Sequence, residues 1–156
     1  MKFKPLKQRD HYSCGPTSLA MLAKFFKLDI SLKEIEKITR YYQRKGLSHR
    51  ELLESAKKIG FRTKEVRFKS WASLKKAFNN PGSAIIVSWM LKGHTGHFSV
   101  VDKITDKYIV LADPNDGKLK KINKIEFLQL WFDYDVLYPK KPSDINLRWG
   151  VVVGKK

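Results

Sequence analysis

The single cysteine of the sequence, Cys14, stands at the start of an apolar run. Apolar residues in this run recur at spacings of three and four, which indicates one face of a helix; they are Leu19, Leu22, Ala23 and Phe26. The backbone amides and the positive dipole end of a helix at this point favour an anion, and the thiolate is the nucleophilic form of cysteine. A lone cysteine is most often an inert small hydrophobe, but the polar, glycine-containing setting here favours a nucleophile.

The residues around the cysteine suit this chemistry. Ser13 is placed to cap the helix, and Pro16 is tolerated in its first turn, where amide protons have no partner within the helix. Gln8 precedes the cysteine by six positions and can aim its side-chain amide at the same place. An amide there can donate a hydrogen bond to an oxyanion.

A cysteine nucleophile needs a base, and four histidines compete for that role. His11 lies in the loop before the cysteine and His49 in the first turn of a charged helix, so both are interpreted as facing solvent. His94 and His97 lie on either side of a glycine where a strand begins. We favour His97 as the base because it leads directly into the apolar strand, which would hold its backbone rigidly.

The base usually needs an acceptor that orients it, and Asp113 is the candidate. A hairpin that pairs residue 97 with residue 113 and residue 104 with residue 106 brings Asp113 beside His97, where its carboxylate would fix the tautomer of the imidazole. The same aspartate opens the turn at 113–117, and capping such a turn is a common use of aspartate. The spacing alone leaves both interpretations open.

Three helices are predicted in the first part of the chain. The second and third begin with capping boxes, Ser31 with Glu34 and Ser48 with Glu51, and the third ends at Gly60, which suits a left-handed C-cap. Strands are then expected at 61–68, 84–89, 97–101, 108–112, 119–122, 136–138 and 147–153, with short helices near 70–78 and 125–131. The 84–89 run is continuously apolar, as in a central strand buried on both faces.

This order predicts an α+β fold in which N-terminal helices pack on one face of a mostly antiparallel sheet. The length of 156 residues suits one domain, residues 1–156, and no linker divides it. One cysteine excludes an internal disulfide and a zinc site of cysteine type, so we expect no metal and no cofactor. Because no apolar run has the length of a signal peptide core or a membrane span, the sequence predicts a cytoplasmic protein without a transmembrane segment.

The chain has 32 basic and 15 acidic residues and a formal net charge of +17. Such an excess favours anionic partners, including nucleic acid. The lysines are scattered rather than massed in a tail, however, and neither a zinc finger nor an aromatic RNA-binding signature is present. We therefore interpret the charge as a solvated basic surface and expect no specific nucleic-acid partner, with nucleic-acid binding as an alternative.

The segment from Gln8 through Ser-Cys-Gly-Pro-Thr-Ser at 13–18, with 97–101 and 112–114, resembles the C39 family of papain-like cysteine peptidases. The resemblance covers about residues 5 to 139, where 125–139 is similar to the closing helix and strand of the family, and leaves the tail 140–156 outside it. It implies a papain-like fold and a hydrolase in which Cys14 is the nucleophile, His97 the base, Asp113 its orienting residue, and Gln8 part of the oxyanion hole.

The resemblance also implies a peptide or protein substrate, leader-peptide processing and an ABC transporter as a partner. Transporter-linked members usually carry a second cysteine four residues after the nucleophile, where this chain has Ser18, and they continue into membrane helices, whereas this sequence ends at Lys156. The motif is closer to the stand-alone C39-like branch, so the cleavage motif stays open. The alternative from another functional class is a peptide-binding module of the same fold that does not cleave.

Overall fold

The computed structural model describes residues 3–91 and 95–156. The helices are α1 (Cys14–Phe25), α2 (Leu32–Thr39), α3 (Tyr41–Arg44), α4 (His49–Ile59), α5 (Trp71–Phe78) and α6 (Lys124–Leu130), with a 3-10 turn at Pro142–Asp144. The strands are β1 (Phe61–Arg67), β2 (Ser83–Leu91), β3 (Thr95–Ile104), β4 (Tyr108–Asp113), β5 (Lys118–Asn123), β6 (Phe132–Asp133), β7 (Asn146–Leu147) and β8 (Trp149–Lys155). Within these described ranges, no helix is long and apolar enough to cross a membrane.

Six strands form one antiparallel sheet in the order β1-β8-β2-β3-β4-β5. The predicted central strand is confirmed, since β2 is buried from Ser83 to Met90 and lies between β8 and β3. The last strand, β8, inserts between β1 and β2, so the C-terminal segment completes the middle of the sheet.

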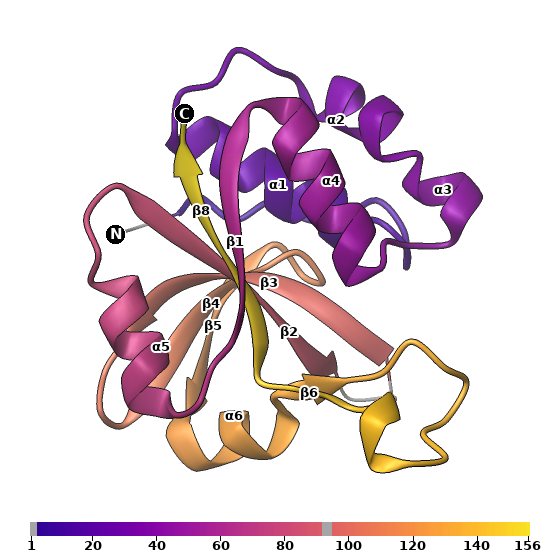
Figure 1. Cartoon of the computed structure of the whole chain (residues 1–156). Coiled ribbons are helices and arrows are strands. Elements are labelled where there is room, and N and C mark those ends of the chain that lie inside the picture. Colours follow the sequence, from indigo (N-terminus) through magenta and orange to yellow (C-terminus); the bar gives the residue numbers. More distant parts are fainter. Residues whose placement is uncertain (1–2, 92–94) are drawn as a thin grey trace.

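Helices cover both faces of this sheet (Figure 1). On one face, α1, α2 and α4 pack over a core that includes Leu22, Ile35 and Leu52. On the other face, α5 and α6 cover a second core that contains Trp131 and Phe127. The α+β class with N-terminal helices on one face of an antiparallel sheet is therefore confirmed, and the two later helices α5 and α6 cover the other face. The second face of β2 and β3 is also apolar and must be covered from water.

The predicted helix ends are confirmed where local chemistry determines them. The hydroxyl of Ser31 accepts from the Glu34 amide and that of Ser48 from the Glu51 amide, and in each box the glutamate returns the bond. Gly60 ends α4 with φ +110°, which a side chain would strain.

The strand predicted at 136–138 is wrong. Leu137 is 93% exposed and this segment runs as an irregular loop, whereas the paired residues are Phe132 and Asp133 of β6. The segment has no neighbouring strand to bond to, because β7 pairs with β6 instead. An apolar run without a partner strand does not become a strand.

Candidate active site

Cys14 is the first residue of α1, and the helix is buried from Cys14 to Ala23. Ser13 is the N-cap residue, but the prediction that its side chain caps the helix is wrong. The Ser13 hydroxyl instead accepts from the backbone amides of Arg9 and Asp10, at 3.0 and 3.1 Å, and donates to the carbonyl of Asp10. The serine therefore fixes the loop before the helix, and the amides at the helix start stay available to an anion beside Cys14.

His97 comes from β3 and is almost fully buried, with 3% of its surface exposed. Its Nε2 atom lies 2.5 Å from Oδ1 of Asp113, which leaves Nδ1 as the ring nitrogen available to Cys14. Burial disfavours the charged imidazolium, but the hydrogen bonds and charges of Asp113 and Cys14 outweigh it and raise the pKa of His97 to about 9. The imidazole is therefore held in its protonated form near neutral pH.

Asp113 ends β4 and has no exposed surface. Its Oδ1 also accepts from the backbone amide of Asn115 at 3.0 Å, and its Oδ2 lies 2.7 Å from Nζ of Lys120. Burial opposes ionisation, but the bonds and charge of His97, followed by those of Lys120 and the Asn115 amide, hold the pKa of Asp113 well below its usual range. One carboxylate thus contacts the imidazole and also caps the turn at Asn115.

The register of the β3–β4 hairpin differs from the predicted one. Val100 pairs with Ala112, which puts Asp113 across from Ser99, so the expected pairing of residue 97 with residue 113 is wrong. A longer turn, in which Ile104 pairs with Ile109, and an irregularity between Val101 and Lys103 shift the strands. His97 still reaches Asp113 diagonally, because residues two apart on a strand share a face.

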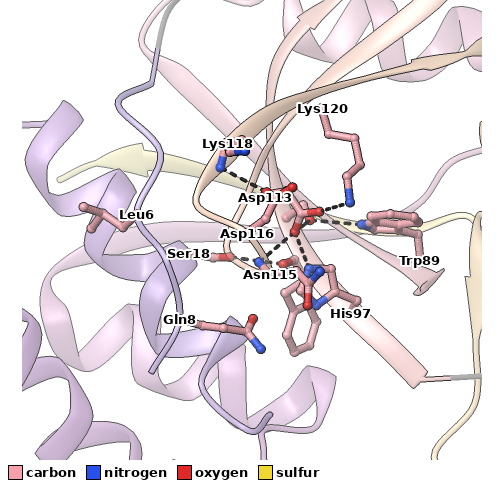
Figure 2. Close-up of polar contacts among 12 residues, drawn as sticks. Leu6, Gln8, Ser18, Trp89, His97, Asp113, Asn115, Asp116, Lys118 and Lys120 are labelled. Atoms are coloured by element: carbon pink, nitrogen blue, oxygen red, sulfur yellow. Dashed lines mark hydrogen bonds and ion pairs between the residues drawn. The ribbon is translucent and has the colours of Figure 1, made fainter. Parts of the chain in front are cut away.

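Gln8 is held in place by its neighbours on both sides. Its backbone amide donates to the carbonyl of Pro114 at 2.7 Å, and its side-chain Nε2 donates to the carbonyl of Asp10 at 2.9 Å. Its Oε1 atom is buried without a hydrogen-bond partner among the described residues. Figure 2 shows the Gln8 side chain extending from its loop toward His97.

Gln8, Cys14 and His97 border one cleft of about 1130 Å³. Its wall brings together the start of α1, the loop before α4, and the ends of β2, β3 and β5; it includes Gln8, Cys14, Leu47, Trp89, His97 and Lys120. Within the described part of the chain, no group of three or more His, Cys, Asp or Glu side chains could hold a metal ion.

The other histidines lie in different settings. His11 is exposed and borders the cleft, as its loop position predicts. The expectation that His49 faces solvent is wrong: it is 8% exposed, its Nε2 lies 2.6 Å from Oδ2 of Asp133, and its ring stacks on Trp149 at 3.9 Å. A partner 84 positions away in sequence causes this burial. His94 lies outside the described residues.

Sequence reasoning missed three residues around Asp113. Trp89 donates from Nε1 to the Ser99 hydroxyl at 3.0 Å, and Ser99 lies 3.4 Å from Oδ1 of Asp113. Lys120 contacts the other carboxylate oxygen. Lys118 pairs with Asp113, and residues 118 and 120 share a face, which places Lys120 beside the carboxylate; the sequence alone does not specify this register.

Comparisons with known proteins agree with this architecture. The Peptidase C39 family model matches residues 2–143. The sublancin-168-processing and transport ATP-binding protein SunT of Bacillus subtilis (strain 168) is 26% identical over 130 residues. These residues are 81% of this chain but 17% of SunT, so the chain spans about one sixth of that relative's length.

Solved structures show the same fold. The peptidase domain of Streptococcus ComA, a bifunctional ABC transporter involved in quorum sensing, superposes with a TM-score of 0.75 at 20% identity, covering 99% of this chain and 100% of that one. A double glycine motif protease from an AMS/PCAT transporter, solved in complex with the leader peptide, gives 0.71 at 21% identity, covering 99% and 93%. With a family model that matches most of its length and a shared fold, this chain belongs to the Peptidase C39 family.

Proposed function

We propose that this chain is a cysteine peptidase that hydrolyses peptide bonds, with Cys14 as the nucleophile and His97 as its acid and base. The observation that carries the proposal is the placement of His97 between Cys14 and Asp113 beside one cleft. The hydrogen bonds and charges of both partners outweigh burial and raise the pKa of His97, so a protonated imidazole stands beside Cys14 at neutral pH, the setting in which a cysteine is activated as a nucleophile.

The reaction follows from this pair. The Cys14 thiolate attacks the carbonyl carbon of the substrate, and the carbonyl oxygen becomes an oxyanion. His97 then gives its proton to the departing amine nitrogen as the C–N bond breaks, which leaves an acyl thioester on Cys14. Neutral His97 takes a proton from water, the hydroxide attacks the thioester, and the thiolate and a carboxylic acid are released. Asp113 orients the imidazole throughout.

Gln8 and the backbone amide of Cys14 are the proposed donors to the oxyanion. The Gln8 amide group has two N–H bonds, and only one is needed for its bond to the Asp10 carbonyl. The second can point into the cleft that Gln8 borders. Each such donor typically contributes ~3 kcal/mol to transition-state stabilisation.

We propose leader peptides as the substrate class. The related protein SunT is described as processing and transporting sublancin, and one protein of the same fold is a double glycine motif protease seen with a leader peptide. An ABC transporter, in the same polypeptide or another, is the matching partner. The basic composition of the chain would favour acidic segments in such a peptide.

The test is incubation with a peptide library and mass spectrometry of the products. The library contains peptides with an internal double glycine and matched peptides in which alanines replace both glycines. We expect cleavage by the natural chain, none by Cys14→Ala, and preference for the double glycine set. If both proteins retain peptides equally and neither forms products, the chain is a peptide-binding module that does not cleave.

A further inference from the structure

Lys120 on β5 reaches into the polar group around Asp113. Its Nζ lies 2.7 Å from Oδ2 of Asp113 and 5.8 Å from the centre of the Trp89 ring, and its side chain is 30% exposed at the edge of the cleft. Figure 2 shows Lys120 and His97 joined to the same carboxylate by separate contacts. The lysine is therefore ordered by an ion pair and an aromatic face rather than extended into water.

The two oxygens of Asp113 have different partners. Oδ1 contacts Nε2 of His97 and accepts from the Asn115 amide, with the Ser99 hydroxyl 3.4 Å away. Oδ2 faces Lys120. Because Asp113 has no exposed surface, little of its charge is screened by water, and two cationic side chains share one buried anion.

We propose that Lys120 is a positioning residue for the peptidase reaction: by holding Oδ2 of Asp113, it fixes the carboxylate and limits how firmly His97 keeps its proton. The inference rests on the proposed function of the same site. It concerns a residue that acts through Asp113 and does not itself touch the reacting atoms.

The physical reason lies in the balance of charges around His97. The groups that face it are Cys14 from α1, Asp113 from β4 and the Trp89 ring from β2. Without Lys120, the negative charge of Asp113 would act on His97 alone, so the imidazolium would become a weaker acid. A general acid works best when its pKa lies near the working pH, and that of His97 is already raised to about 9. Lys120 thus helps His97 to release its proton to the leaving amine.

The experiment compares Lys120→Met with Lys120→Arg, which retains the charge, and with Lys107→Met. Lys107 is exposed in the turn at the far end of the β3–β4 hairpin, so its variant removes one lysine charge without touching Asp113. The readout is the titration of His97, followed by NMR with labelled histidine and assigned against His97→Ala. It needs no substrate. The alkaline limb of kcat/KM against pH is measured in parallel.

We expect the His97 midpoint to rise by about one pH unit in Lys120→Met and to stay near that of the natural chain in both other variants. Lys120→Gln should raise the His97 midpoint as well, and it replaces Lys120→Met as the test if the Met variant does not fold. An unchanged or lowered His97 midpoint in Lys120→Met would overturn the inference. If the midpoint is unchanged and only the KM for acidic peptides rises, Lys120 is a substrate contact instead. A raised midpoint with no cleavage by any variant would show that Lys120 controls the His97 proton through Asp113, but it would refute the proposed function and with it a role for Lys120 in peptide hydrolysis.

Discussion

The Nε2 atom of His97 and the Oδ1 atom of Asp113 lie 2.5 Å apart, although the two residues are not directly opposite in the β3–β4 hairpin. The same oxygen accepts from the Asn115 amide. The two interpretations of Asp113 that the sequence left open, an orienting residue and a turn cap, are therefore compatible in one geometry. The two roles predict different effects of a substitution at Asp113.

Asp113→Asn should lower turnover clearly while most stability is kept. Asparagine retains an acceptor for the Asn115 amide but loses the charge that favours imidazolium, and its amide group can enforce the wrong tautomer. We expect a loss smaller than the ~10⁴-fold cost of the same change in a serine protease, because a cysteine peptidase depends less on a charged orienting residue. Turnover per folded molecule and the melting temperature are the measurements. Unfolding with unchanged turnover would make Asp113 a turn residue only.

Peptidase activity and stability should both decline as the pH passes about 9. The pKa of His97 is raised from 6.5 to about 9. The stabilising contribution of His97 is therefore complete below about pH 6.5 and is lost as the pH rises through about 9. The difference in melting temperature between the natural chain and His97→Gln should shrink over that interval. A constant difference across it would contradict the raised pKa.

Gln8→Ala should reduce kcat by about 10²-fold with little change in KM, because an oxyanion donor acts mainly in the transition state. The matched control is Gln43→Ala, which removes an exposed glutamine from α3. Steady-state kinetics on one peptide substrate separates the two parameters. A rise in KM at constant kcat would instead mean that Gln8 only binds substrate.

The pair of His49 and Asp133 should contribute mainly to stability. Asp133 is buried, accepts from Ser88, and loses its hydrogen-bond partner in His49→Ala, which we expect to cost about 3 kcal/mol of unfolding free energy. His11→Ala is the control, since His11 is exposed. Equal unfolding free energies in denaturant for both variants would show that the pair contributes nothing.

Burial disfavours the charged form of Asp133, but the hydrogen bond and charge of His49, together with the hydrogen bond from Ser88, lower the pKa of Asp133 below the ordinary 3.8. The contribution of Asp133 to stability is therefore present above about pH 3.8 and is lost as the pH falls through the lower pKa of the folded state. The advantage of the natural chain over Asp133→Asn should shrink in that acidic range.

Local chemistry made much of the fold predictable. The capping boxes at Ser31 and Ser48 and the C-cap at Gly60 depend on residues within one turn, so the sequence specifies them directly. The apolar continuity of 84–89 likewise predicted the central strand. Cys14, His97, Asp113 and Gln8 could be nominated because each stands at a boundary between predicted elements, where side chains converge.

Features that depend on contacts between residues far apart in the sequence were not predictable. The hairpin register depends on the irregularity near Asp102, whose carboxylate accepts from the Phe3 amide 99 positions away. The burial of His49 requires Asp133 and Trp149, which its charged neighbours in α4 do not indicate. Lys120 looked like one more surface lysine because no local pattern shows that Asp113 lies beneath it.

Whether Cys14 is a nucleophile is tested by the rate at which iodoacetamide alkylates it at near-neutral pH, read from the intact mass. The chain has one cysteine, so the mass change reports Cys14 alone. We expect alkylation much faster than that of a free cysteine peptide, because a helix start and a neighbouring histidine activate a cysteine, and a fall toward the peptide rate in His97→Ala. Equal rates for the natural chain, His97→Ala and the peptide would show that Cys14 is an inert structural cysteine and contradict its role as the nucleophile.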